Sequence, residues 1–170
     1  MPLNGTKLTL TVTGDLVLSD GFVEGHAAMN KSYSTILANG VGAGQADRRY
    51  HKTRTLAASA TEDLDLAGVL TDVYGAVLTF ARVKALIIAA AAANANNVIV
   101  GGAAATQFLS WVGAATHTVT VRPGATLALI AGVADSVGYV AGAGADFLRI
   151  GNGGAGTSVT YDITVIGCSA

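Results

Sequence analysis

The stretch SVTYDITVI, residues 158–166, decides the fold class of this chain. Val159, Tyr161, Ile163 and Val165 are apolar, and the residues between them are serine, threonine or aspartate. Alternation with a period of two is typical of a β-strand that has one buried and one solvated face. This stretch therefore predicts a strand at the surface of a layered β-protein.

Similar alternation recurs from residue 47 onward, with glycine-rich turns between the segments. Many short alternating segments in 170 residues predict an antiparallel sandwich or barrel rather than a catalytic α/β scaffold. Pro123-Gly124 and Asn152-Gly153-Gly154 have the most definite turn chemistry. We expect strands at residues 47–56, 61–66, 77–90, 97–100, 108–112, 116–122, 126–131, 146–150 and 158–166.

The longest expected strand contains one ambiguous stretch. Residues 81–93 include five consecutive alanines, which favour a helix. The β-branched Val83, Ile87 and Ile88 favour a strand instead, and the asparagines after the alanines indicate a polar loop. We predict a strand followed by a loop, with Val83 and Ile87 on one face and Leu86 and Ile88 on the other.

The first 45 residues are separated from the rest by a glycine-rich segment. Gly40, Gly42 and Gly44 lie within five residues, which predicts a hinge. Short strands are expected before it, at residues 7–12, 16–18 and 33–37. We therefore predict an extended N-terminal arm or outer hairpin at residues 1–45 and a β-sandwich at residues 46–170.

The composition argues for a surface that is covered by other protein. The net charge is −1 and only 12% of the residues are charged, against about 25% in ordinary soluble domains. Such a surface suits burial against copies of itself or within a larger assembly, although a merely neutral surface of small residues is the alternative. The balanced charge gives no reason to expect nucleic acid or an anionic membrane as a partner.

No group of residues predicts catalysis, a metal site or a cofactor. The glycine-rich residues 151–158 lack the lysine of a phosphate-binding loop. Glu62, Asp63 and Asp65 are expected on a solvated strand face, and Asp72 in a turn. The widely spaced His26, His51 and His117 and the single Cys168 do not have metal-ligand spacing. We expect no enzyme, no cofactor and no small-molecule substrate.

One short run of the chain is strongly basic. Arg48, Arg49, Lys52 and Arg54 are four of the ten lysines and arginines in the chain. The run suits either an edge strand that discourages unwanted pairing or a strip that contacts an acidic partner. The sequence leaves both interpretations open.

Several blocks of the chain resemble a group of virion proteins of tailed bacteriophages. These blocks are TRTLAASATEDLDLAG at residues 53–68, LTD at 70–72, FARVKAL at 80–86, VGG at 100–102, VRPG at 121–124 and TSVTYD at 157–162. The resemblance covers nearly everything after Gly40, except that the alanine-rich residues 89–93 depart from it. It implies a jelly-roll-like sandwich, a homo-oligomer with a trimer favoured, and a place on the virion after synthesis in the host cytoplasm.

The function expected from this resemblance is that of a capsid cement or decoration protein. Such a protein would bind the major capsid protein on the outside of the head. The alternative is a receptor-binding or fibre-tip module whose loops contact the host, and a carbohydrate-active enzyme using Asp63 or Asp65 is remote. The copy number per virion separates the first two hypotheses.

Overall fold

The structure is a computed structural model that describes residues 3–103, 105–142 and 144–170. These residues contain twelve β-strands and no helix, which confirms the predicted all-β class. The strands are β1 (Thr6–Ser19), β2 (Glu24–Asn39), β3 (Gln45–Ala46), β4 (Arg48–Leu56), β5 (Thr61–Asp65), β6 (Arg82–Ala90), β7 (Val98–Gly101), β8 (Thr118–Val121), β9 (Thr126–Ile130), β10 (Tyr139–Val140), β11 (Phe147–Asn152) and β12 (Val159–Cys168).

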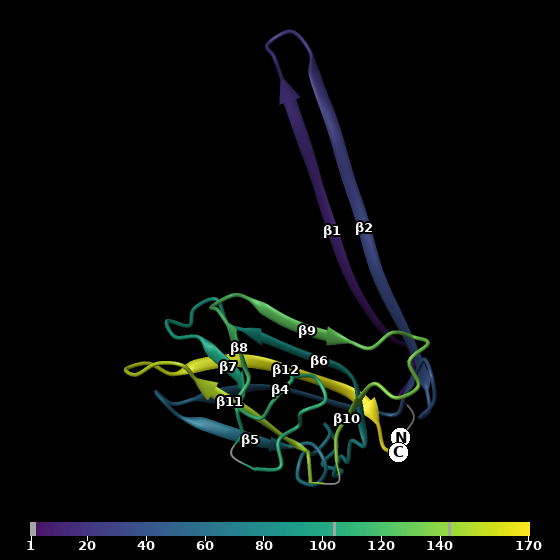
Figure 1. The fold of residues 1–170 in the computed structure, drawn as a ribbon, viewed down its shortest axis with the longest axis vertical. Helices are drawn as coiled ribbons and strands as arrows, with labels where there is room; N and C mark the ends of the chain where they lie inside the picture. Colours follow the sequence, from purple (N-terminus) through teal and green to yellow (C-terminus); the bar gives the residue numbers. More distant parts are fainter. Residues whose placement is uncertain (1–2, 104, 143) are drawn as a thin grey trace.

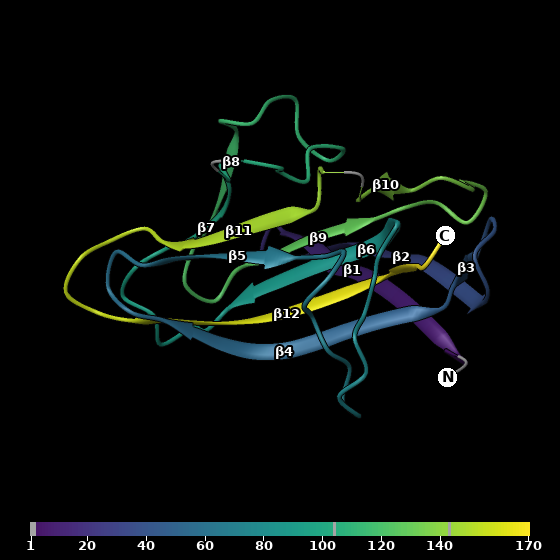
Figure 2. The same ribbon diagram turned by 90° about the horizontal axis from the view of Figure 1, so that it is seen from below.

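Two antiparallel sheets form the sandwich. The first has the order β10-β6-β12-β4, with β9 pairing the remaining length of β6 beside β10. The second has the order β5-β11-β7-β8. Figures 1 and 2 show these sheets as the compact body of the molecule, from whose edge the β1–β2 hairpin projects.

The chain winds between the sheets as in a jelly roll. Strands β4, β6, β9 and β12 lie in the first sheet, whereas β5, β7, β8 and β11 lie in the second. Most successive strands therefore cross from one sheet to the other, and the last strand, β12, inserts between β4 and β6. Such double-sheet winding confirms the predicted jelly-roll-like antiparallel β-sandwich.

The main hydrophobic core fills the space between the two sheets. All four apolar residues of the alternating stretch that predicts β12 are fully buried there. Tyr50 and Leu56 of β4, and Leu64 and Leu66 at β5, face the same core, as their alternation predicts. Burial of apolar side chains on one face of each strand is the main stabilising contribution to this region.

The strand β6 is shorter than expected and contains a bulge. Residues 77–81 do not belong to the strand, although Val77 makes an isolated bridge with Thr71. Opposite Ile166 and Gly167 of β12, the register skips Lys84. Because one extra residue reverses the alternation, Val83 faces the main core together with Leu86, and its predicted placement with Ile87 is wrong.

Other boundaries agree more closely with expectation, with one exception. The alanine-rich stretch leaves β6 at Ala90 and continues as a turn, which confirms the predicted strand followed by a loop. The segment 108–112 is not a strand. Phe108 is buried in the core. The Trp111 indole Nε1 donates a hydrogen bond to the Phe108 carbonyl oxygen over 3.0 Å, so a local turn replaces the predicted strand.

The N-terminal hairpin is much longer than the short strands that we expected. β1 and β2 pair over 14 residue positions, from Thr6 with Leu37 to Ser19 with Glu24. At about 3.4 Å per residue, the ribbon is roughly 45 Å long. Figure 1 shows it standing away from the sandwich along most of its length. We call residues 6–39 the arm.

A second hydrophobic cluster fixes the base of the arm to the sandwich. Leu8 and Leu37 of the arm, together with Ala46 of β3, pack against Ala85 and Ile166 on the outer face of the first sheet. The bulge permits this contact, because it places Val83 in the main core and leaves Ala85 facing outward. The base of the arm is thus part of the folded body, while the rest is not.

Candidate interaction surface

The arm is an amphipathic ribbon with one apolar and one polar face. Directly paired residues of a ribbon share a face, and faces alternate along each strand. Leu10 pairs with Tyr33, Gly14 with Met29 and Leu16 with Ala27, so these side chains lie on the same face as the buried Leu8 and Leu37. The opposite face carries Lys7, Thr9, Thr11, Thr13, Asp15, Glu24, His26, Asn30, Ser32 and Ser34, with Val17 and Ile36 as its large apolar members.

Six large apolar side chains are exposed on the apolar face. We call them the apolar strip: Leu10, Val12, Leu16, Leu18, Met29 and Tyr33. Their exposed fractions run from 40% for Val12 to 76% for Leu18. Isolated exposed apolar residues are normal on protein surfaces, but a contiguous apolar face of this length indicates an interaction site.

The polar face of the hairpin carries side chains that bond to one another or to water. Thr11 and Ser32, which are directly paired, lie 3.3 Å apart at their hydroxyl oxygens. The His26 ring Nδ1 lies 2.7 Å from the Asp15 carboxylate. These groups can remain in water at no cost, whereas the apolar face can be buried only by a partner. A two-stranded ribbon without a packed face is marginally stable in water.

The tip of the arm is a tight turn with an exposed aromatic side chain. The Asp20 Oδ1 accepts hydrogen bonds from the backbone N–H groups of Phe22 and Val23, over 2.9 and 2.8 Å. These bonds favour the ionised carboxylate and lower the pKa of Asp20. The turn holds Phe22 outward with 97% of its surface exposed, so the end of the arm is as available for contact as its strip.

The glycine-rich segment after the arm forms a hydrogen-bonded loop. The Ala38 N–H donates to the Gly44 carbonyl over 2.9 Å, and the Gly42 N–H donates to the Gln45 Oε1 over 2.8 Å. Gly40 and Gly44 have φ values of +142° and +63°, which favour glycine. The hinge predicted at Gly40, Gly42 and Gly44 stays a prediction, and in this structure the loop is held in one compact conformation.

The basic run does not form one strip. In β4, Arg48, Lys52 and Arg54 share the face of the buried Tyr50, whereas Arg49 lies on the other face with His51. Arg48 pairs with Asp47, whose Oδ2 lies 3.1 Å from its Nη1. Arg49 and Lys52 remain exposed on opposite faces of the edge strand. A capsid or partner contact through all four residues stays a prediction, and this division weakens it.

Arg54 belongs to a polar cluster between the sheets. Its Nε donates to the Glu62 Oε2 over 2.8 Å, and the hydroxyl of the buried Tyr161 donates to the other oxygen of that carboxylate. The bond to Glu62 raises the pKa of Arg54, and burial together with Glu62 raises the pKa of Tyr161. Glu62 therefore points into the sandwich, so its predicted place on a solvated face beside Asp63 and Asp65 is wrong. The cause is strand parity, since Glu62 shares a face with Leu64.

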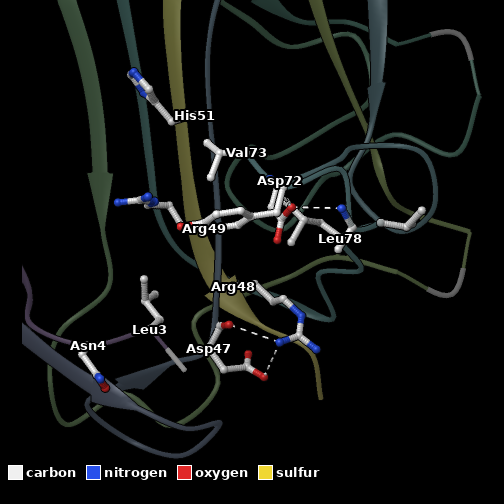
Figure 3. Close-up of a pocket in the computed structure, with 12 residues that line it drawn as sticks. Leu3, Asn4, Asp47, Arg48, Arg49, His51, Asp72, Val73 and Leu78 are labelled. Carbon is white, nitrogen blue, oxygen red and sulfur yellow. Dashed lines mark hydrogen bonds and ion pairs between the residues drawn. The ribbon is translucent and has the colours of Figure 1, made fainter. Parts of the chain in front are cut away.

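A hollow of about 480 Å³ lies at the foot of the arm, shown in Figure 3. Its walls come from the start of the chain, from β4 and from the loop before β6. Arg48 turns toward Asp47, and Arg49 extends in the opposite direction (Figure 3). The Asp72 carboxylate accepts hydrogen bonds from the N–H groups of Tyr74 and Ala76, as its predicted turn role requires. Asp47, Arg48 and Asp72 are thus engaged in interactions within the fold.

Several other titratable residues have structural roles. Asp63 and Asp65 share a strand face, and Asp63 forms a two-bond ion pair with Arg149, which lies directly opposite on β11. The Asp65 Oδ1 accepts a hydrogen bond from the Ala67 N–H. Cys168 is buried, and burial raises the pKa of its thiol. Among the described residues, no three histidine, cysteine or acidic side chains are placed to hold a metal ion, and no helix could span a membrane.

Comparison with models of protein families, with curated proteins and with solved structures gives no match to this chain.

The sequence predicts the arm only in part. The alternation of Leu8, Leu10 and Val12 was visible, and it continues in Leu16 and Leu18 across Gly14. The same parity on both sides of that glycine is the signal that would have revealed one long strand.

Proposed function

We propose that this protein is a structural subunit of a bacteriophage virion, and specifically a capsid decoration protein on the outer surface of the head. The sequence blocks that resemble phage virion proteins support this assignment. The jelly-roll-like sandwich supports it as well, because that architecture is common among virus capsid domains.

One observation carries the proposal: a rigid sandwich presents a long ribbon whose apolar strip is exposed. The strip contributes nothing to the core of its own chain, because the cluster at the base of the arm ends at Leu8 and Leu37. A chain that extends such a surface into water is built to make contacts with other protein molecules. The role that follows is adhesive, and it needs no reaction chemistry.

The sandwich and the arm have different tasks in this proposal. The sandwich supplies a stable platform with a full core between its sheets. The arm is roughly 45 Å long, and most of it projects from that platform, so it can reach a neighbouring subunit. On an icosahedral head, many identical contacts act together, so contacts that are weak individually hold the layer in place.

Counting copies on purified particles tests the proposal directly. Quantitative mass spectrometry of virions that carry this protein should find hundreds of copies per particle, because decoration follows the lattice of the head. Electron cryomicroscopy of the same particles should place the sandwich on the capsid exterior. About a dozen copies at the tail tip would favour a receptor-binding module instead, and absence from purified particles would refute a virion role of either kind.

A further inference from the structure

We propose that the apolar strip packs face to face against the same strip of a second copy of this chain, so that two arms form a small four-stranded β-sandwich. The proposal names the partner of the arm and stands on the arm's own geometry. It therefore holds or fails independently of the place of the protein on a virion.

The chemistry of the strip selects an apolar partner. The face that carries it contains 14 residues in the β1–β2 pairing, of which Lys31 alone is charged. The Lys31 ammonium lies 5.8 Å from the centre of the Tyr33 ring, so its stem can cover apolar surface while its charge reaches water. A face with no carboxylate and one lysine offers little to a charged partner and much to another apolar face.

The polar face of the arm also fits a sandwich of two arms, in which it would be the outer, solvated face. In a β-sandwich, each sheet turns one apolar face inward and one polar face to water. The arm has the same division, with the Asp15–His26 and Thr11–Ser32 pairs on its wet face. It is therefore constructed like one layer of a sandwich whose second layer is missing from this chain. A second copy supplies a layer of identical chemistry.

The sandwich offers the strip a poorer surface than another arm does. On the outer face of the first sheet, β4 and β12 present polar pairs, which include Thr55 with Thr160 at 3.0 Å and His51 with Thr164 at 2.8 Å. The apolar part of that face, around Ala85 and Ile166, is already covered by the base of the arm. Packing the strip onto the threonine-rich part would bury hydroxyl groups for little apolar gain.

The area of the strip is sufficient for a specific contact between two copies. Six large side chains at the observed exposures provide roughly 500 Å² of apolar surface per arm, or about 1,000 Å² when two arms meet. This is near the lower limit for a specific interface, so the association should be reversible and strengthened wherever copies are already held close together.

Cysteine cross-linking of the full chain tests the proposal with a control at the neighbouring residue. Met29 lies on the apolar face at the middle of its exposed length, paired with Gly14, whereas Asn30 points to the polar face. In a face-to-face pair, Met29 lies near the symmetry axis whether the two arms run parallel or antiparallel. Cys168 is buried, so it contributes little background.

We expect M29C to form covalent dimers with a bismaleimide whose spacer spans about 10 Å, the distance between packed sheets, and N30C to form at least tenfold fewer. Failure of M29C to cross-link at concentrations where the two arms should meet would overturn the proposal. Equal cross-linking of both variants would overturn it too, because that result indicates collisions without a preferred face.

A second measurement uses charge in place of cysteine. Leu16→Lys should weaken self-association by at least tenfold in sedimentation equilibrium, whereas Thr13→Lys on the polar face should leave it unchanged. Circular dichroism should show the same β-spectrum for both variants, because neither side chain contributes to the core. A wild-type chain that stays monomeric, or a Leu16→Lys chain that associates as strongly as wild type, would overturn the proposal. Neither result would alter the copy number found on virions.

Discussion

The arm and the sandwich are built from the same sequence pattern but place it in opposite environments. Ile163 of β12 and Leu16 of β1 both lie in long strands in which apolar residues recur at alternate positions. Ile163 is fully buried between two sheets, whereas 75% of the Leu16 surface is exposed. Alternation thus specifies a strand with a dry face, but it does not specify whether the dry face is covered by its own chain.

The apolar faces of the two regions stabilise different things. In the sandwich, each strand finds a facing sheet in the same chain, and the apolar alternation stabilises the monomer. In the arm, the facing layer must come from elsewhere, so the same alternation stabilises an assembly. The boundary between these regions lies at Leu8 and Leu37, where the apolar face of the arm stops touching the sandwich.

Truncating one apolar side chain in each region should give the largest contrast. Ile163→Ala should lower the free energy of unfolding by about 3 kcal/mol or more, because it leaves a cavity in a fully packed core. Leu16→Ala should lower it by less than about 0.5 kcal/mol, because an exposed side chain is removed. Urea unfolding of dilute protein, where arms are unpaired, measures both values. Comparable losses in the two variants would show that the arm packs against its own sandwich.

Much of the sandwich could be predicted from the sequence, because strands such as β4 and β5 bury a single face. The alternation of β4, β5 and β12 gave the correct buried residues, including Tyr50, Leu64 and Tyr161. The bulge at Lys84 could not be predicted, since it depends on the register between β6 and β12, which are far apart in the chain. The strand predicted at residues 108–112 is wrong for a related reason, because a buried aromatic residue such as Phe108 can pack from a turn as well as from a strand.

A smaller contrast is expected within β2 itself. Leu37 and Tyr33 share the apolar face, but 2% of Leu37 is exposed at the base of the arm, against 59% of Tyr33 further along. Leu37→Ala should cost about 2 kcal/mol and loosen the base of the arm. Tyr33→Ala should cost less than about 0.5 kcal/mol in the monomer. Hydrogen exchange should show faster exchange around Thr6 and Ala46 in the first variant alone, and unchanged exchange there would contradict the proposed anchoring cluster.

The candidate site was harder to predict than the fold. Gly14 and Asp15 interrupt the apolar residues of β1, and glycine is a common sign of a turn, so the sequence suggested two short strands. The length of the ribbon is set by its pairing with β2, and a single strand does not reveal its partner. The density of the basic run suggested a partner contact or a protected edge strand, yet Arg48 and Arg54 form ion pairs within the fold.

The smallest expected effect concerns the charges that the sandwich holds on its surface. Hydrogen bonds from Arg149 hold the pKa of Asp63 below its usual range. Because the pKa of Asp63 is lower in the folded state than the ordinary value of about 3.9, the pair stabilises the fold above that pH and loses its effect as the pH falls through the folded pKa. Both side chains are partly exposed, so the contribution should be about 0.5 kcal/mol.

Asp63→Asn should therefore lower the free energy of unfolding slightly at neutral pH, and the difference from wild type should shrink once the pH is well below the ordinary aspartate pKa. Asp15→Asn, which removes the partner of His26 on the exposed arm, should leave the unfolding of the sandwich unchanged at both pH values, because that pair lies outside the folded body. Urea titrations of the three proteins at neutral and acidic pH make the comparison. An equal loss for Asp15→Asn would show that the arm and the sandwich unfold as one cooperative unit, with the charges of the ribbon contributing to the stability of the body.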